Sequence, residues 1–413
     1  MKKTLLLSIV ASTMIMAGGD IAPVEPAVVT PAPVVESNWK FSGQGVVYYQ
    51  TDDVGISGTG AGDLFEQVAS GANAGLQLTA TNSDLIAGIG FGAQLNALGT
   101  LGLEEDVVSN VMQLANGSLN SAYVSQLYLT YGIANTSLKV GRQELPKALS
   151  PFAFSEDWNV FTNTFNAALV VNTDLPDTVL VGAWVRDNNT NGMHAEMNTF
   201  ASTNDGDGVF MLTAQNKSIA DLTLTGSWYY GSDFVTADDL NILWADAQYN
   251  AGFANIGLQG GAVMHDAFPD DITAIGVQAS GKLDIVNVSA AYSHTNDGGI
   301  PALGYTGAFN VGGSTSALYT ETALNQVTGG AVLPNLRYDA DKFVVTAGAD
   351  VLGGNLTGVY AYSDTGLYSD FNEVDVVYST SITENLSAAL AYVYTDVVAG
   401  DVNLIRAVAK YNF

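Results

Sequence analysis

The 413-residue sequence contains no cysteine, which excludes disulfide bonds and thiolate metal sites. Charged residues make up only 13% of the chain, about half the share typical of a soluble domain. Lys and Arg number 13 against 41 Asp and Glu, and this acidic balance excludes binding to nucleic acid. Beyond the N-terminus there is no apolar run of about 18 residues or more, so no transmembrane helix is predicted.

The chain nevertheless has a high apolar content. Hydrophobic residues reach 47% and aromatic residues 10%, glycine occurs 44 times, and the mean hydropathy is positive. An apolar chain that is poor in charge and lacks helical spans is expected to have lipid over much of its surface. The composition alone would also suit a secreted β-solenoid or β-sandwich.

The N-terminus has the pattern of an export signal. Lys2 and Lys3 precede an apolar stretch, and small residues follow from Ala17. We therefore expect residues 1–17 to be a signal peptide. Residues 18–38 hold four of the ten prolines and predict an extended tether in the periplasm.

From Trp39 onward, short segments of alternating apolar and polar residues are separated by Gly, Asn, Asp and Ser. A period of two predicts β-strands with one apolar and one polar face. Each segment has about the 9–11 residues that a tilted strand needs to cross a membrane. We expect about 18 strands, near 40–50, 72–82, 84–95, 121–132, 135–143, 166–173, 177–187, 208–217, 220–231, 240–250, 253–264, 271–281, 284–295, 341–350, 355–363, 370–381, 385–396 and 401–413.

Short and long connections alternate between these segments. Tight turns, as at 82–83 and 134–135, alternate with long connections such as 96–120 and 296–340. An even strand number with this asymmetry is typical of outer-membrane barrels. We therefore predict an all-β fold over residues 39–413, a transmembrane antiparallel up-and-down β-barrel of about 18 strands, with 16 as the alternative. Its short turns would be periplasmic and its long loops extracellular.

The last strand separates the two faces clearly. Phe413, Tyr411 and Ile405 share one face, and Lys410 and Arg406 share the other. A basic residue facing lipid near the midplane costs about 2–4 kcal/mol, so both should face the interior. The terminal Phe with a Tyr two residues earlier resembles the last strand of bacterial outer-membrane barrels, which their assembly machinery reads. An ordinary terminal strand of a sheet is the alternative.

The connection Glu144–Phe165 has two prolines, five aromatic residues, Lys147 and the acidic pair Glu156–Asp157. It is too apolar for a solvated loop, so it should pack against the protein. A rigid loop inside the lumen would narrow a channel, whereas the alternative is packing on the outer rim. Two other loops, at 63–68 and 104–116, have short patches of helical spacing. These would pack on the barrel rim or on a neighbouring subunit.

Three segments carry a resemblance to known proteins: Leu138–Gln143, Asn166–Asn172 and Leu222–Tyr230. With the proline-containing loop between the first two, they look like the OprD-like 18-stranded porins and, more closely, the campylobacterial major outer-membrane porins. The resemblance implies a channel for small hydrophilic solutes, an inward third loop and a trimeric assembly. OprD-like channels also carry a ladder of arginines for carboxylates, whereas this chain has only four arginines.

A pore orients a polar solute by placing charges of both signs across the lumen. The basic pore-lining candidates are Lys139, Arg142, Lys147, Arg186, Arg406 and Lys410. The acidic candidates are Glu144, Glu156, Asp157, Glu373 and Asp375. Strict alternation puts Arg142 on the face of Leu138 and Val140, so it would reach the lumen only at a bulge or at the rim.

These features predict a porin in the outer membrane of a Gram-negative bacterium, a water-filled channel for passive diffusion of ions and small hydrophilic solutes. The acidic charge predicts a preference for cations. The expected partners are membrane lipid and lipopolysaccharide, a barrel-assembly machinery that reads Tyr411 and Phe413, and further copies in a homotrimer. The alternatives are a channel selective for carboxylates or another solute class, and a surface adhesin or structural barrel.

No catalytic site and no cofactor are predicted. Ser293–His294 and His265–Asp266 are neighbours in sequence, and neighbours on a strand point to opposite faces. No G-x-S-x-G nucleophile motif occurs. Paired aspartates such as Asp52–Asp53 would suit Ca²⁺ in the acidic loops, with a solvated loop as the alternative.

Overall fold

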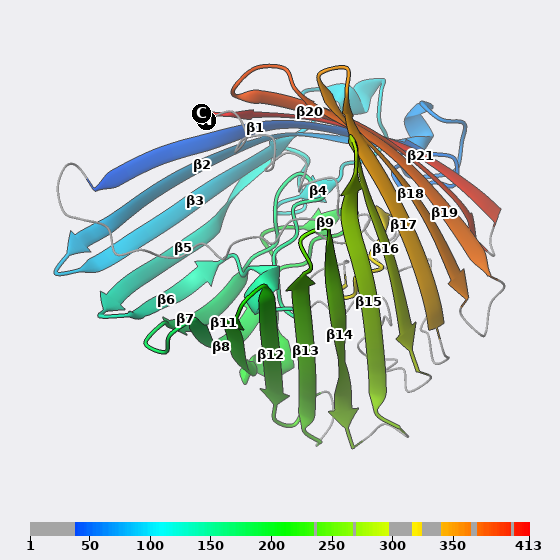
Figure 1. Cartoon of the computed structure of the whole chain (residues 1–413). Helices are drawn as coiled ribbons and strands as arrows, with labels where there is room; N and C mark the ends of the chain where they lie inside the picture. Colours follow the sequence, from blue (N-terminus) through cyan, green and yellow to red (C-terminus); the bar gives the residue numbers. More distant parts are fainter. Residues whose placement is uncertain are drawn as a thin grey trace.

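The barrel predicted from the sequence is present in the computed structural model, which describes residues 38–234, 238–266, 270–296, 316–323, 340–364, 370–397 and 400–413. Eighteen long antiparallel strands form one closed wall (Figure 1). The all-β class and the count of 18 rather than 16 strands are therefore confirmed.

The wall strands follow the chain in order, and their bounds lie close to the predicted ones. They are β1 (Trp39–Asp52), β2 (Ser70–Ile86), β3 (Ile89–Gly99), β5 (Ser121–Ile133), β6 (Thr136–Gln143), β7 (Phe165–Asn172), β8 (Thr178–Asn188), β11 (Val209–Ile219), β12 (Leu222–Gly231), β13 (Leu240–Asn250), β14 (Ala254–His265), β15 (Ile272–Leu283), β16 (Val286–Thr295), β17 (Ala340–Val351), β18 (Gly354–Asp364), β19 (Phe371–Ser381), β20 (Leu386–Val397) and β21 (Gly400–Asn412).

The remaining elements are short and lie in the connections. Within the described ranges they are the strands β4 (Gln113–Leu114), β9 (Ala195–Glu196) and β10 (Ala201–Ser202), and the 3-10 helices η1 (Gln67–Ala69), η2 (Leu103–Glu105), η3 (Lys147–Leu149) and η4 (Thr203–Gly206). None of the helices in the described part of the chain has the length and apolar character needed to cross a membrane.

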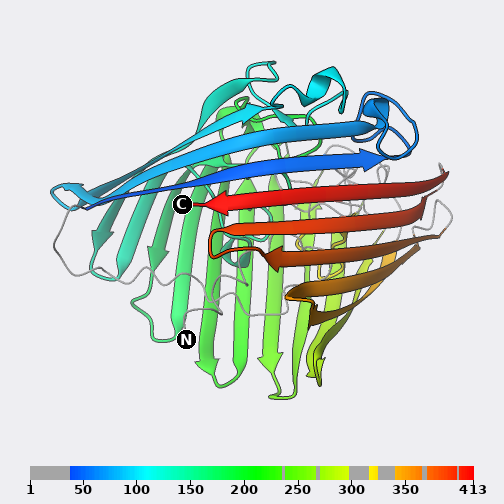
Figure 2. The same cartoon turned by 90° about the horizontal axis from the view of Figure 1, so that it is seen from above.

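The first and last strands close the barrel. β1 pairs with β21 from Gln44 opposite Asn412 to Asp52 opposite Leu404, and Figure 2 shows the two strands side by side in blue and red. Gly43 and Phe413 extend the seam, because each backbone N–H donates to the other's carbonyl, at 2.8 and 3.0 Å. Every wall strand thus has two neighbours, and no sheet edge is left open.

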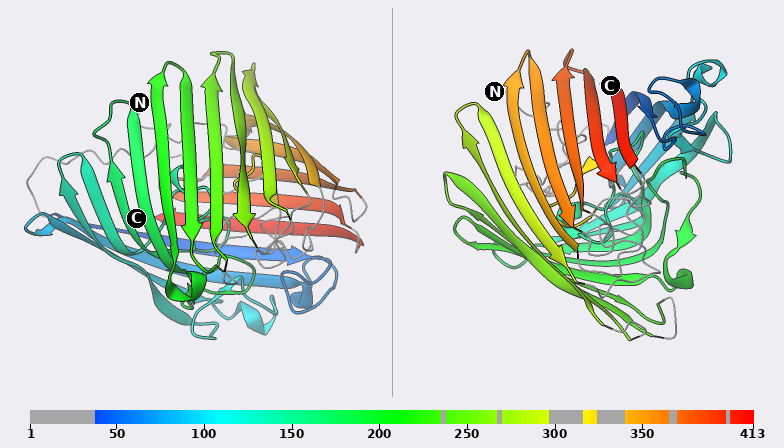
Figure 3. Two further views of the ribbon diagram at one scale, coloured as in Figure 1. Left: turned by 90° about the horizontal axis from the view of Figure 1, so that it is seen from below. Right: turned by 90° about the vertical axis from the view of Figure 1, so that its right-hand side faces the viewer.

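The two faces of the wall differ as the alternation predicts. On β12, Leu224 and Trp228 point outward and are 39% and 40% exposed, whereas Ser227 and Tyr229 are buried on the inner face. The same alternation runs through β19, where Val374 and Val376 face outward. Figure 3 shows this wall from two further sides. A continuous apolar outer face is what a barrel in a bilayer requires.

The first turn differs from its predicted position. We expected it at residues 82–83, but β2 continues to Ile86 and the turn lies at Ala87–Gly88. Both turn residues have positive φ, 53° and 81°, as a two-residue hairpin of the primed type requires. Asn82 instead marks a register shift, where its Oδ1 accepts the Asp84 N–H at 3.0 Å.

The helical patches predicted at 63–68 and 104–116 are also wrong. Only η1 and η2 form there, because the backbone groups of the second patch bond to distant residues. The N–H groups of Met112 and Gln113 both donate to Asn73 Oδ1, at 2.7 and 2.9 Å, and β4 pairs with β9. Long-range pairing has replaced the local bonds of a helix.

The barrel interior is partly filled by its own loops. Figure 1 shows the loops that carry β4 and β9 within the ring of strands. Val160 and Phe161 of the connection between β6 and β7 pack with Met112 against Val46 of β1 and Val408 of β21. This connection, residues 144–164, is called the third loop below. An apolar cluster on the inner wall therefore fixes the loops in the lumen.

Candidate channel constriction

The third loop crosses the lumen and is clamped at its far end. Gln113 Nε2 donates to the Phe161 carbonyl at 2.8 Å, and the Phe161 N–H donates to Gln113 Oε1 at 3.0 Å. Nearer its start, Phe152 packs edge-on against Tyr229 and Trp244 of the opposite wall, with ring centroids 5.5 and 5.3 Å apart. A loop held at both sides of the barrel is rigid enough to narrow the passage.

Trp158 is the buried centre of the loop. It is 2% exposed, and its Nε1 donates to Glu156 Oε2 at 3.0 Å. The Arg406 guanidinium of β21 lies 5.2 Å from the Trp158 ring, and its Nε donates to Gln50 Oε1 at 3.0 Å. Glu156 and Arg406 are themselves nearly fully buried. Of these two predicted pore residues, Arg406 therefore contacts the loop from the wall and Glu156 bonds to the Trp158 side chain within the loop, roles that the sequence did not suggest.

Four other predicted residues form a row of charges. Lys139 of β6 lies near Glu144, Glu144 near Asp157, and Asp157 near Lys410 of β21. Two wall lysines thus flank two loop carboxylates. Such an arrangement places charges of both signs next to each other at the third loop, and charges of both signs are what orientation of a polar solute requires.

The carboxylates of this row are held in place and shifted in pKa. Glu144 Oε1 accepts from Gln126 Nε2 and from Thr162 Oγ1, both at 2.8 Å. Burial raises the pKa of Glu144, while the bond from Thr162 and the charge of Lys139 lower it. Burial also raises the pKa of Asp157, and Lys410 opposes this shift. Both groups therefore lose their charge at a higher pH than ordinary carboxyl groups do.

A second part of the chain also enters the lumen. Residues 316–323, called the inserted segment, belong to the long connection between β16 and β17. Tyr319 OH donates to Asp246 and accepts from Gln248 Nε2 at 2.6 Å, both on the inner face of β13. On the opposite side, the hydroxyls of Thr320 and Ser293 are 2.5 Å apart. The segment is thus bound to both β13 and β16.

The inserted segment also meets the third loop. Lys147 Nζ donates to the Ser316 carbonyl at 2.7 Å, and Lys342 Nζ of β17 donates to Thr322 Oγ1 at 2.7 Å. Glu321 lies between them, 4% exposed, with Oε2 accepting the Ser316 N–H at 2.7 Å. Burial raises the pKa of Glu321 to about 8, although Lys342 and Lys147 lower it.

Glu373 and Asp375 lie side by side on the inner face of β19, 1% and 0% exposed. Asp375 is near both Glu373 and Lys342, and the backbone of Ala323 reaches it from the inserted segment. The parity predicted for these two residues is confirmed by their burial. The inserted segment covers them, so they form part of its support.

Two predicted arginines do not face the lumen. Arg142 pairs with Leu127, an outward residue that is 51% exposed, and its guanidinium stacks 3.7 Å from the Phe200 ring. The bulge that could have turned it inward does not form at this position. Arg186 is skipped in the pairing of β7 with β8, and its side chain is 55% exposed and 3.9 Å from Asp187.

The aromatic end of the chain lies on the outer face. Tyr411 and Phe413 are 47% and 55% exposed and stack with ring centroids 6.2 Å apart. Their orientation agrees with the alternation read from the sequence, with Arg406 buried on the opposite face. Recognition of these rings by an assembly machinery stays a prediction.

The described residues include no group of three or more His, Asp or Glu side chains that could hold a metal ion. Asp52 instead accepts backbone N–H groups of its own loop, from Val54 at 3.0 Å and Ile56 at 2.9 Å. Ser293 faces the lumen, whereas His294 bonds to Asp341 at 3.0 Å, so the two neighbours do not form a nucleophile–base pair.

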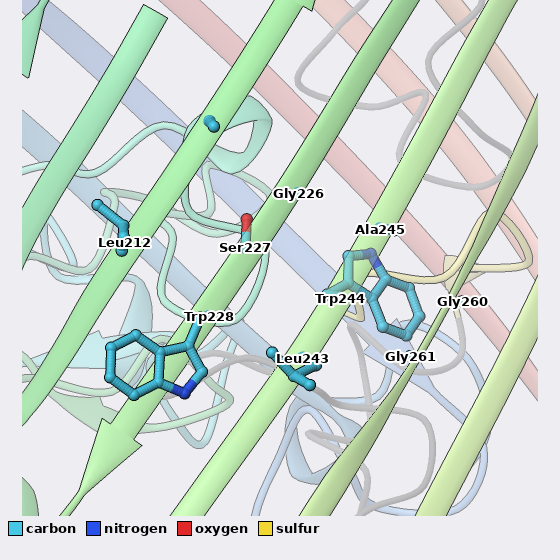
Figure 4. Close-up of a pocket in the computed structure, with 10 residues that line it drawn as sticks. Leu212, Gly226, Ser227, Trp228, Leu243, Trp244, Ala245, Gly260 and Gly261 are labelled. Carbon is cyan, nitrogen blue, oxygen red and sulfur yellow. The ribbon is translucent and has the colours of Figure 1, made fainter.

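A groove of about 490 Å³ lies on the other side of the wall (Figure 4). Leu212, Trp228 and Leu243 line it, and all three belong to the exposed outer face. Small residues between them, including Gly226 and Gly260, leave the space open. This groove faces away from the lumen and is not part of the passage.

Sequence reasoning missed four side chains of the interior: Asp246, Tyr319, Glu321 and Lys342. Asp246 could have been found, because it alternates with outward Leu243 and Ala245 on a predicted strand. No local pattern marks the inserted segment, which lies inside a connection of more than forty residues in the sequence.

No protein-family model matches the sequence, and no curated protein matches it significantly. Solved structures do match. OccK8 (OprE) of Pseudomonas aeruginosa aligns with a TM-score of 0.66 and 16% identity, over 91% of this chain and 98% of that one. OccAB2 of Acinetobacter baumannii aligns with a TM-score of 0.68 and 15% identity, and OccK9 (OpdG) of P. aeruginosa with a TM-score of 0.68 and 14% identity. Both alignments also cover 91% of this chain and 98% of the other. These are 18-stranded outer-membrane porins, and the expected likeness to OprD-like porins is confirmed for the fold.

Proposed function

We propose that this protein is an outer-membrane porin, a water-filled channel through which ions and small hydrophilic solutes diffuse passively. The observation that carries the proposal is a closed barrel with an apolar outer face and a polar inner face, narrowed by a clamped third loop. A wall built this way separates lipid from water and leaves a passage of restricted width.

The membrane would be the outer membrane of a Gram-negative bacterium. The exposed apolar rows fit lipid and lipopolysaccharide as partners, and the outward Tyr411 and Phe413 fit recognition by the assembly machinery. A homotrimer is part of this proposal. In bilayer recordings, three equal closing steps per insertion event would support it, and single steps would refute it.

We expect the channel to prefer cations. The chain carries a net charge of −28, and Glu144 and Asp157 of the third loop add two carboxylates between Lys139 of β6 and Lys410 of β21. A negative field concentrates counter-ions in a low-dielectric passage. Lys139 and Lys410 oppose this field, so the preference should be moderate.

A channel for carboxylate solutes is the second candidate. OccK2 (OpdF), another similar structure with 12% identity, is described in complex with glucuronate. In this chain Arg406 is buried and bonded to Gln50, which leaves Lys139 and Lys410 as the groups for a solute carboxylate. The sign of the ion selectivity separates the two candidates.

The test is a planar-bilayer recording of purified protein in a salt gradient. A porin gives discrete steps, and the reversal potential reports the ion preference. Asp157→Asn should shift the reversal potential towards anions, whereas Asp401→Asn, at an exposed position, should not. A folded barrel that passes no current would refute the channel and favour an adhesin or structural barrel.

A further inference from the structure

The guanidinium group of Arg142 lies on the outer face of the wall, at the end of β6 that enters the third loop. Its Nη1 donates to the Val124 carbonyl at 2.7 Å, and its Nε donates to Asn166 Oδ1 at 3.3 Å. The Phe200 ring covers one face of the group, 3.7 Å away. A guanidinium group has five N–H donors, so three donors of Arg142 have no acceptor among the described residues.

Arg186 lies at the same level of the wall, two strands away (Figure 1). Asn166 of β7 pairs with Arg142 of β6 and with Asp187 of β8, and Arg186 is the extra residue of the bulge in β8 at this point. Asn166 Nδ2 donates to Asp187 Oδ2 at 3.0 Å. The Arg186 side chain is 55% exposed, and its Nη1 is 3.9 Å from the same oxygen, which is too far for a hydrogen bond.

The two guanidinium groups therefore share one carboxylate. Arg142 also lies close enough to Asp187 to interact with its charge. Two positive groups with one negative group between them leave the cluster with a net positive charge. We call Arg142, Arg186, Asn166 and Asp187 the rim cluster.

The rim cluster lies at the edge of the apolar outer surface. Trp184 of β8, two residues before Arg186, pairs with Phe210 of β11, whose side chain is 54% exposed on the outer face. Trp184 Nε1 donates to the Asp207 carbonyl at 2.8 Å. An indole with its ring on the outer face and its N–H bonded to a loop is typical of the lipid–water interface. A basic side chain is costly at the bilayer midplane and costs little at this level.

The other basic residues in the described part of the chain lie elsewhere. Those near the ends of strands that the short turns join are Lys40, Lys217 and Lys282. Those that contact the lumen wall or its loops are Lys139, Lys147, Lys342, Arg406 and Lys410. On an acidic chain, the rim cluster is thus a local positive site on the outer surface, at the level of lipid headgroups.

We propose that Arg142 and Arg186 bind a phosphate group of lipopolysaccharide in the outer leaflet. The inference rests on the proposed outer-membrane location, and it names the residues and the chemical group through which this partner is held. The planar fork of N–H donors on a guanidinium group matches the oxygen atoms of a phosphate. Phe200 and Asn166 hold the Arg142 fork in place, and the exposed Arg186 closes on the phosphate from the neighbouring strand.

The test measures binding of lipid A to the whole protein, refolded into detergent micelles without lipopolysaccharide. Wild-type protein should bind lipid A that carries its phosphate groups about 100-fold more tightly than lipid A from which they have been removed, since each of two charge-assisted contacts contributes roughly a factor of ten. The double variant Arg142→Gln, Arg186→Gln should lose this difference. Inorganic phosphate at the same concentration as the lipid should not displace it.

Two further variants serve as controls. Lys217→Gln, Lys282→Gln removes the same number of charges at the opposite end of the wall and should bind as the wild type does. Arg142→Lys, Arg186→Lys keeps both charges but loses the planar forks, so its affinity should lie between those of the wild type and the glutamine variant. The mobility of each variant in unheated SDS gels shows whether the barrel has folded.

The outcomes separate this site from the channel. Equal binding of both forms of lipid A to the wild type refutes the site, as does tight binding of the phosphorylated form to a folded Arg142→Gln, Arg186→Gln barrel. Displacement by equimolar inorganic phosphate refutes the assignment to a lipid. A barrel that conducts ions but fails these binding tests keeps its channel function, whereas a barrel that binds as expected but passes no current keeps the site and loses the channel.

Discussion

Truncation of Trp158 to alanine should loosen the third loop without harming the barrel. The side chain is 2% exposed, donates to Glu156 at 3.0 Å and stacks 5.2 Å from the Arg406 guanidinium. Loss of a buried Trp costs about 3–5 kcal/mol. Even the lower figure weakens docking of the loop by roughly 100-fold, since about 1.4 kcal/mol is a factor of ten.

The strands do not depend on Trp158, because the wall is closed by backbone hydrogen bonds between neighbouring strands. Single-channel recordings should therefore show a larger and noisier conductance for Trp158→Ala, while its mobility in unheated SDS gels stays that of a folded barrel. Trp228→Ala, on the outer face, is the matched control. A Trp158→Ala channel with the wild-type conductance and noise would show that this ring does not hold the constriction.

Three further outcomes are expected. Deletion of Phe413 removes two backbone hydrogen bonds to Gly43, each contributing about 0.5–1.5 kcal/mol. The folded fraction recovered from membranes should therefore fall. An unchanged fraction would speak against a role of this residue in barrel closure. Asp53→Ala removes two hydrogen bonds that join the residue after β1 to Asn403 of β21, and it should lower the unfolding temperature, which heat-modifiability gels can measure. Burial raises the pKa of Glu144 and Asp157, so both lose their charge at a higher pH than ordinary carboxyl groups do. On acidification, the cation preference should therefore decline already at that higher pH. Reversal potentials that stay constant down to about pH 4 would contradict this.

Much of the wall could be predicted because a strand repeats every two residues and lipid accepts few charges. Lys410 and Arg406 had to oppose Phe413 for this reason, and Arg406 is buried on the inner face while Phe413 is exposed on the outer one. The same rule already separated Arg142 from the lumen face. The first turn was misplaced because Asn82 resembles a turn residue, whereas its side chain caps a bulge inside β2.

The loops were less predictable because their partners are far away in sequence. The apolar spacing at 104–116 suggests a helix, yet Asn73 and the strand β9 supply the hydrogen bonds of that segment. Likewise, the sequence suggested that Glu156 is a pore charge, whereas its side chain is buried and accepts a hydrogen bond from Trp158. The spacing of apolar residues predicts hydrogen bonds between residues that are close in sequence, and these segments form few such bonds.

The amino-acid sequence by itself determined a closed, lipid-facing cylinder, its strand order and the two faces of regularly alternating strands such as β12 and β19, because alternation and the cost of charge in lipid act on each strand separately. Only the tertiary structure decided which side chains meet across the lumen. Glu321 reaches Ser316, Lys147 and Lys342 from three different parts of the chain, and Trp158 meets Arg406 about 250 residues away. Such contacts depend on how the loops fold back into the barrel, and the hydrophobic periodicity of the sequence does not predict this.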